Sequence, residues 1–242
     1  MISVCIATHN GEKYIKEQLD SILCQLSPED EVVISDDGST DSTLEIIKGY
    51  NDPRIKIFTK VHTLKGMKSH YYVTMNFENA LKHAKGDYIF LSDQDDVWYP
   101  NKVKTCIESL RSYDIVIHNL EFMDMEGNSL GRRRYVDSFE KENILMTGAI
   151  HFGCAMAFRA EWLKDILPFP TRLTLHDFWI SFIIERLGNP NFLMEPLIRY
   201  RFREDSVSHA TSNDLIYKIQ YRLYIIYFML CRLIKIKFKK KI

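Results

Sequence analysis

Short runs of apolar and β-branched residues alternate with helical patterns along the first hundred residues. The runs are SVCIAT, EVVISDD, RIKIFTK and GDYIFLSD, at residues 3–8, 31–37, 54–60 and 86–93. Between them, apolar residues recur at helical spacing over 12–26, after the cap-forming residues 40–43, and over 72–85. The alternation predicts an α/β protein with a Rossmann-like, mixed central sheet flanked by helices.

The second half of the chain is less regular. In order, its pattern predicts a helix over 100–111, strands over 114–119 and 120–125, a charged loop over 132–141, a strand over 153–159, a helix over 176–186 and a strand pair near 192–200. A long helix rich in aromatic and basic residues follows from about Asp214. We expect one domain over 1–212, with a nucleotide-binding half (1–100) and an acceptor-binding half (101–212), and an appended amphipathic helix over 213–242.

Composition narrows the class of protein. Of 242 residues, 46% are hydrophobic and 26% are charged, which is typical of a globular domain. The 32 Lys and Arg balance the 32 Asp and Glu, so no nucleic acid partner is expected. The balance hides a basic tail without acidic residues, because the charged residues from Leu215 onward are Lys218, Arg222, Arg232, Lys235, Lys237, Lys239, Lys240 and Lys241.

The cysteines and the N-terminus favour a cytoplasmic location. Five cysteines are scattered without a Cys-x-x-Cys pair or a zinc-type cluster, as is typical of reduced thiols. The chain enters its first strand without a basic leader and contains no run of about 18 uncharged apolar residues. We therefore expect neither a cleaved signal nor a spanning helix.

Three carboxylates in four residues, at Asp93, Asp95 and Asp96, stand at the end of the strand pattern Tyr88–Leu91. Such a cluster repels itself unless a cation neutralises it, and Mg²⁺ and Mn²⁺ prefer carboxylate and phosphate oxygens. The pattern indicates a platform for a metal and a diphosphate. The alternative is a solvated acidic turn that caps the next helix.

Two further turns stand at strand ends. Asp36-Asp37-Gly38 could accept a hydrogen bond from a pyrimidine N–H, and Thr8-His9-Asn10-Gly11 ends the first run. Each taken alone is equally an ordinary Asp-Gly or Asn-Gly turn. All three turns are nevertheless predicted at the carboxyl ends of strands, where such sheets bind ligands.

The segments SVCIATHNGEKYIKEQLDSIL, EVVISDDGSTDST and GDYIFLSDQDDVW, in this order, closely resemble glycosyltransferase family 2, the inverting enzymes of the GT-A fold. SDQDDVWYPNKV, GCAMAFRAEW and LHDFW resemble its bacterial rhamnosyltransferase-type branch, which builds surface polysaccharides. The resemblance implies transfer of a hexose, or a deoxyhexose such as rhamnose, to a glycan or lipid-linked acceptor. It further implies a UDP- or dTDP-linked sugar donor and Mn²⁺ or Mg²⁺ as cofactor.

The resemblance also assigns roles to residues. Its nucleotide contacts match Thr8, Asn10, Asp36 and Asp37, and Asp93 lies near the ribose and diphosphate as the first acid of the DxD motif. Its metal contacts match Asp95 together with Asp93. In YRFREDSVSH the family pattern is altered, so His209 is a candidate metal ligand, and Arg201 and Arg203 are candidate diphosphate contacts.

Asp177 matches the catalytic base. An inverting transfer needs a carboxylate that takes the proton of the acceptor hydroxyl, and Phe178 and Trp179 beside it could stack on a sugar. The alternative is a helix-capping aspartate next to a core tryptophan. Gly153 is expected next to a ligand or, equally, in a plain core strand.

The basic aromatic tail is expected to lie on the inner face of the cell membrane, as a peripheral attachment. The alternative is a helix that packs on the core. Two other function classes stay open: a sugar-nucleotide nucleotidyltransferase, although its Gly-rich basic loop is missing, and a non-catalytic sugar-nucleotide-binding or membrane-adaptor protein. The sequence does not choose between a monomer and a homodimer.

Overall fold

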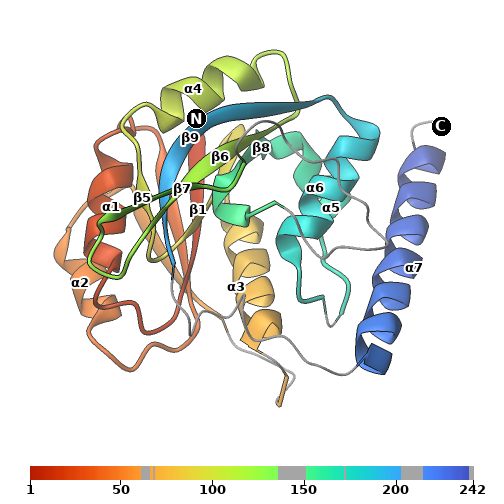
Figure 1. Ribbon diagram of the computed structural model, residues 1–242, viewed down its shortest axis with the longest axis horizontal. Helices are drawn as coiled ribbons and strands as arrows, with labels where there is room; N and C mark the ends of the chain where they lie inside the picture. Colours follow the sequence, from red (N-terminus) through yellow and green to blue (C-terminus); the bar gives the residue numbers. More distant parts are fainter. Residues whose placement is uncertain (61–65, 68, 136–150, 172, 203–214, 240–242) are drawn as a thin grey trace.

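The chain folds into a single sheet with helices packed on both faces (Figure 1). The computed structural model describes residues 1–242 except 61–65, 68, 136–150, 172, 203–214 and 240–242. The sheet runs in the order β3-β2-β1-β4-β8-β6-β9-β5, and β7 pairs with β6 at the side. Helices α1, α2 and α4 cover one face, whereas α3, α5, α6 and α7 lie over the other.

The first half follows the predicted alternation. Its strands are β1 (Ile2–Thr8), β2 (Glu31–Asp36), β3 (Ile55–Thr59) and β4 (Tyr88–Asp93), and its helices are α1 (Ile15–Leu23), α2 (Thr43–Gly49) and α3 (Ser69–His83). All four strands are parallel to their neighbours in this set. Cys5 packs into one core and Val4 into the other, so the strands are apolar on both faces, as buried parallel strands require.

The second half contains β5 (Val97–Trp98), α4 (Lys102–Leu110), β6 (Ile115–Met123), β7 (Ser129–Arg133), η1 (Gly153–Ala155), β8 (Met156–Arg159), η2 (Ala160–Trp162), α5 (Leu163–Ile166), α6 (His176–Leu187) and β9 (Pro190–Arg201). Three predictions were wrong here. The two strands expected over 114–125 are the single strand β6, the pair near 192–200 is the single strand β9, and the start of the expected strand 153–159 is the turn η1.

The reason is that β6 and β9 are long parallel partners that bend at irregularities instead of breaking. Their register shifts on either side of Asn119. The side-chain amide of Asn119 donates to the carbonyls of Tyr135 (2.7 Å) and Met194 (3.1 Å). It therefore supplies hydrogen bonds to backbone groups near the shift in register. Residues 129–133, at the edge of the expected charged loop, pair with β6 as β7.

Helix α7 (Leu215–Lys239) packs on the α6 side of the molecule. Ile225, Met229 and Ile236 are buried in the core. The Arg232 guanidinium donates to the carbonyls of Asp165 (2.7 Å) and Pro168 (2.6 Å). One face of α7 therefore packs on the core, as the alternative interpretation of the C-terminal helix expected. Among the helices that the structure describes, none combines the length and apolar character needed to cross a bilayer.

The tight approach of Gly86 to β1 yields a stability prediction. A Cβ at Gly86 would lie 2.6 Å from the Ser3 amide nitrogen and 2.7 Å from the Ile2 carbonyl carbon, and backbone cannot give way cheaply. Gly86→Ala should lower the free energy of unfolding by about 1–3 kcal/mol, as other overpacking changes do. The measurement is thermal unfolding of the full chain.

Gly49→Ala is the matched control, since a Cβ there meets nothing within 4 Å. It adds a helix-favouring residue at the end of α2 and should leave the melting temperature unchanged or slightly higher. Equal destabilisation by both changes would contradict the packing explanation.

Candidate functional site

The carboxyl ends of β1 and β2 meet side by side. Thr8 stands opposite Asp36 in the register, and its hydroxyl donates to the Asp36 carboxylate at 3.0 Å. The same carboxylate accepts from the Ser39 amide (2.9 Å) and the Ser39 hydroxyl (2.6 Å), and Asp36 is buried. Asp36 therefore builds the turn that positions Asp37, whose amide donates to the Thr8 carbonyl at 2.9 Å.

Asn10 braces the loop after β1 against the loop after β2. The backbone N–H of Asn10 donates to the Ser39 hydroxyl at 2.9 Å. The side-chain oxygen of Asn10 accepts from the backbone N–H of Thr40, also at 2.9 Å. Asn10 also adopts a positive φ of 48°, a conformation that asparagine tolerates better than most residues. The hollow beside it, of about 390 Å³, is lined by Asn10, Glu12, Lys13, Tyr14, Thr40, Asp41 and Met125.

Gln94 joins the β4 end to the same loops, a contact that the sequence did not predict. Its side-chain oxygen accepts from the His9 amide at 2.9 Å and its nitrogen donates to the His9 carbonyl at 3.1 Å. Asp93 stands opposite Ala7 in the sheet. The three predicted turns therefore do share one edge of the sheet, and they are held together by side-chain hydrogen bonds.

Asp93, Asp96 and Cys154 form a compact cluster at that edge. One potential ligand atom from each lies within 4.8 Å of the others. Asp96 is 1% exposed, and its Oδ2 has no hydrogen-bond partner among the described residues. From the sequence, Asp96 was only an acid next to the predicted ligands. In the structure it is the most buried of the three aspartates Asp93, Asp95 and Asp96. Asp95 is not a member of this cluster, so its metal contact stays a prediction.

The carboxylates of the cluster are hard to ionise together. Burial, followed by the charge of Asp95, raises the pKa of Asp93 to about 7, and Asp177 adds to the effect. Burial and the charges of Asp93 and Asp95 raise the pKa of Asp96 well above its usual range. A divalent cation would relieve both costs, and the two carboxylates supply the hard oxygen ligands that Mg²⁺ and Mn²⁺ take. The residues present therefore fit such an ion.

Lys102 lies behind the cluster and was missed by the sequence analysis. It is fully buried. Its ammonium donates to the Cys154 carbonyl at 2.7 Å and lies 4.2 Å from the centre of the Trp98 ring. Burial lowers its pKa to about 8, although the acids nearby oppose that shift. The only signal in the sequence was a lysine on the otherwise apolar face of α4, at the spacing of its buried residues.

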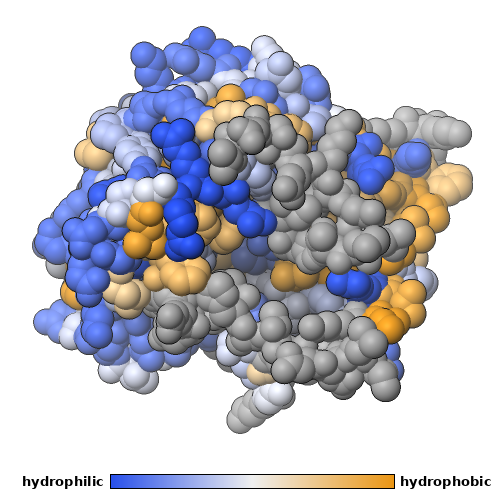
Figure 2. All heavy atoms as spheres, in the orientation of Figure 1, coloured by the Kyte–Doolittle hydropathy of each residue, from blue (hydrophilic) through white to orange (hydrophobic). Residues whose placement is uncertain are grey.

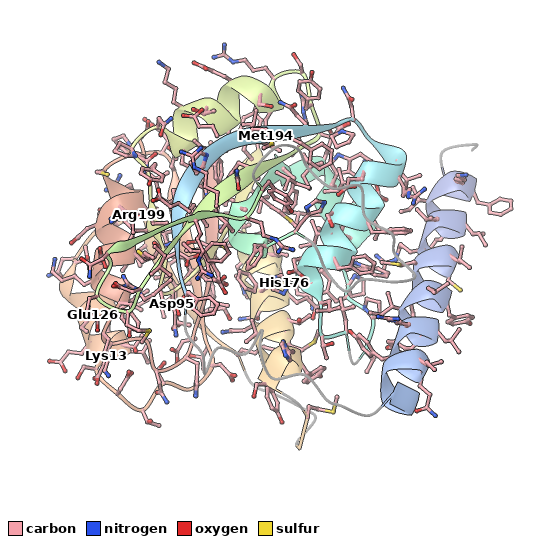
Figure 3. The ribbon with its side chains drawn as sticks, viewed as in Figure 1. Lys13, Asp95, Glu126, His176, Met194 and Arg199 are labelled. Atoms are coloured by element: carbon pink, nitrogen blue, oxygen red, sulfur yellow. The ribbon has the colours of Figure 1, made fainter. Side chains whose placement is uncertain are left out.

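Asp177 lies in the first turn of α6, and its charge acts on Asp93. The preceding His176 stacks on Phe77 of α3, with 4.2 Å between ring centres, and a Cβ on Gly153 would lie 2.9 Å from the His176 Nε2 and 3.6 Å from the Asp177 Cβ. Gly153 is thus needed for close approach to α6. Figure 3 shows His176 beside α3, where α6 begins.

For this turn, stacking of the aromatic rings on a sugar and capping by Asp177 are both wrong, whereas the core tryptophan of the alternative interpretation is confirmed. The N-cap of α6 is Leu175, so Asp177 does not cap the helix. Phe178 and Trp179 are 8% and 1% exposed, and the Trp179 ring nitrogen donates to the Ile166 carbonyl at 2.9 Å. Both rings belong to the core and are not available to stack on a sugar.

Comparisons with known proteins identify the family and the fold. Residues 3–167 match the family model described as glycosyl transferase family 2. The chain belongs to that family. The GT-A fold is confirmed by solved structures: S. aureus TarS in complex with UDP-GlcNAc superposes with a TM-score of 0.61 at 23% identity, over 87% of this chain and 61% of that chain.

Other known proteins extend the similarity. Glucosyl-3-phosphoglycerate synthase from Mycobacterium tuberculosis, in complex with Mn²⁺ and UDP, gives a TM-score of 0.60 at 18% identity, over 92% of this chain and 79% of that chain. An uncharacterized glycosyltransferase of Rickettsia felis is 31% identical over 88% of this chain, which spans only 36% of that relative. The dTDP-rhamnosyl transferase RfbG of Shigella flexneri is 28% identical over 90% of this chain and 77% of its own length.

Arg201, which the sequence predicts as a diphosphate contact, makes extensive contacts within the protein. It is 3% exposed. Its guanidinium donates to the carbonyls of Asp95 (2.9 Å) and Met125 (2.7 Å) and to the Glu17 carboxylate (2.7 Å). Because these groups already use its donors, Arg201 ties the β4 loop to α1. The other candidates in that segment, Arg203 and His209, lie outside the described residues.

The raised pKa of Asp93 predicts an unusual pH dependence for the metal-free protein. Between the ordinary pKa of about 4 and the folded value, the folded state holds a proton that the unfolded state has lost, so stability falls as pH rises through this window. The melting temperature should be several degrees lower at about pH 8 than at about pH 5.5, at roughly 2–4 °C per kcal/mol. Mn²⁺ should recover most of this loss at the higher pH.

Asp93→Asn is the matched variant, because it keeps the shape of the side chain and removes its charge. It should weaken both the pH dependence and the response to Mn²⁺. A wild-type protein that is more stable at the higher pH without metal would contradict the electrostatic picture of the cluster.

Proposed function

We propose that this protein transfers a sugar from a nucleoside-diphosphate donor to a glycan or lipid-linked saccharide, with inversion at the anomeric carbon, during synthesis of a cell-surface polysaccharide. The observation that carries the proposal is the convergence of Asp93, Asp96 and Asp177 at the edge of the sheet where the β1 and β2 loops also end. In an α/β sheet this edge is where a nucleotide binds.

In the proposed complex, Thr8, Asn10, Asp36 and Asp37 form the nucleoside side of the site. The hydrogen bonds that brace Asn10 and Asp36 hold this wall rigid, so little conformational entropy is lost when the donor binds. Asp93, Asp95 and Asp96 would hold a Mg²⁺ or Mn²⁺ ion. When bound, such an ion stabilises the negative charge that develops on the departing diphosphate.

Asp177 is the proposed general base. Its carboxylate takes the proton of the acceptor hydroxyl while the hydroxyl oxygen forms a bond to the anomeric carbon. The bond from that carbon to the diphosphate oxygen breaks, and the nucleoside diphosphate leaves from the opposite face. The first turn of α6 is fixed by buried Trp179 and by the stacking of His176 on Phe77, which suits a group whose position decides the rate.

The similarity to the rhamnosyl transferase of Shigella flexneri supports a dTDP-linked deoxyhexose as the donor to test first, with UDP-hexoses as the alternative. A cytoplasmic location on the inner face of the membrane belongs to the same proposal, because it brings the enzyme to a lipid-linked acceptor.

A thermal-shift panel of nucleotide sugars with and without Mn²⁺ or Mg²⁺ tests donor binding directly. The matching donor should raise the melting temperature only when metal is present, since a ligand at a hundred times its Kd adds about 2.7 kcal/mol of stability. Asp93→Asn should abolish the shift. A shift with a nucleoside triphosphate and a sugar phosphate, but with no nucleotide sugar, would favour a nucleotidyltransferase.

Asp177→Asn separates catalysis from binding. Loss of a general base should reduce turnover by about 10²–10⁴-fold, measured as nucleoside diphosphate released in the presence of acceptor, whereas the donor-dependent thermal shift should remain. Asp87→Asn, at a carboxylate paired with the N-terminus on the surface, should leave turnover unchanged. Full turnover in the Asp177 variant would overturn its assignment as base, and no turnover in the wild type with a bound donor would favour a non-catalytic sugar-nucleotide-binding protein.

A further inference from the structure

Helix α7 is apolar on two opposite faces. Its inner face, with Ile225, Met229 and Ile236, is buried against the α6 side of the core. Its outer face carries large apolar side chains exposed by between 49% and 67%, namely Ile219, Leu223, Tyr227, Leu230, Ile234 and Phe238. We call these six residues the outer stripe. Figure 2 shows apolar surface gathered along the edge of the molecule where α7 lies.

The spacing of the outer stripe describes a straight band. Its two triplets, 219, 223, 227 and 230, 234, 238, repeat after eleven residues, and at 3.6 residues per turn all six fall within an arc of about 100°. The second triplet is rotated from the first by only about 20°, so the band stays nearly straight over the length of α7. A straight apolar band suits a flat surface.

Charge and area argue against a second copy of this chain as the occupant. Exposed Lys235 and Lys237 flank the far end of the stripe, and α7 contains no acidic residue, so two copies would bring like charges together. The stripe is about 28 Å long, and at a helix width of about 10 Å it offers roughly 300 Å². A stable interface needs about 800 Å² from each partner.

We infer that the outer stripe of α7 docks on an anionic lipid surface, with the helix lying in the plane of the membrane interface. Its apolar side chains would enter the acyl boundary while the lysines contact lipid phosphates. The inner face stays on the core, so the whole domain would be held at the membrane without unfolding of α7. The inference rests on the membrane location in the proposed function and adds the residues that would make the contact, but it does not depend on the chemistry at Asp177.

Co-sedimentation of the full chain with vesicles tests the inference. The probes are phosphatidylcholine vesicles and vesicles in which a third of the lipid is phosphatidylglycerol. Wild type should bind the anionic vesicles more tightly, and binding should weaken when salt rises from about 0.1 M to about 0.5 M. Leu223→Glu with Leu230→Glu should weaken binding at least tenfold, because two buried leucine side chains are lost.

Two further variants keep the result interpretable. Leu130→Glu with Met194→Glu adds the same charge at exposed apolar residues outside α7 and should bind as wild type does. Lys235→Gln with Lys237→Gln should weaken binding to anionic vesicles by about fivefold for each cation removed. Helix content and melting temperature should stay at wild-type values in all three.

Equal binding of wild type and the Leu223/Leu230 variant would overturn the inference, as would equal affinity for neutral and anionic vesicles. A wild-type dimer that the same variant converts to a monomer, measured by sedimentation velocity, would assign the stripe to a second copy instead. Donor-dependent thermal shifts should be the same in every variant, so failure of vesicle binding and failure of the proposed transferase function are distinguishable.

Discussion

The structure depends on placing acidic side chains where water cannot fully solvate them. Asp93 and Asp96 meet at the end of β4 next to Cys154, with the charges of Asp95 and Asp177 close enough to raise the pKa of Asp93. The repulsion between these carboxylates has to be offset by favourable interactions elsewhere in the site. The buried ammonium of Lys102 and the thiol of Cys154 supply part of that balance, and a cation would supply the rest.

The loops around the acids are rigid for a related reason. Backbone groups at the ends of β1 and β2 cannot pair within the sheet, so side chains of Gln94, Ser39 and Asn10 satisfy them. Arg201 does the same for the carbonyls of the β4 and β6 loops while it pairs with Glu17. The site is therefore assembled by hydrogen bonds that cross from one strand end to the next.

The alternation of strands and helices in the first half was predictable because each run carries its own apolar period and turn residues. The positions of Thr8, Asp36 and Asp93 at one edge followed from that topology alone. The second half was harder, because a bend at Asn119 and the long pairing of β6 with β9 depend on partners distant in sequence. Burial was harder still: nothing local distinguishes Asp96 from Asp95, marks Lys102 as an interior cation, or tells that Trp179 faces the core instead of a ligand.

The stacking of His176 on Phe77 has a consequence for how this chain can diversify. The residue before the proposed base comes from the second half of the chain, and the ring that fixes it comes from α3 in the first half. A chimera that joined one half to the corresponding half of a relative would inherit a mismatched contact unless both rings were exchanged together. Any exchange of one half therefore has to keep this pair of rings matched.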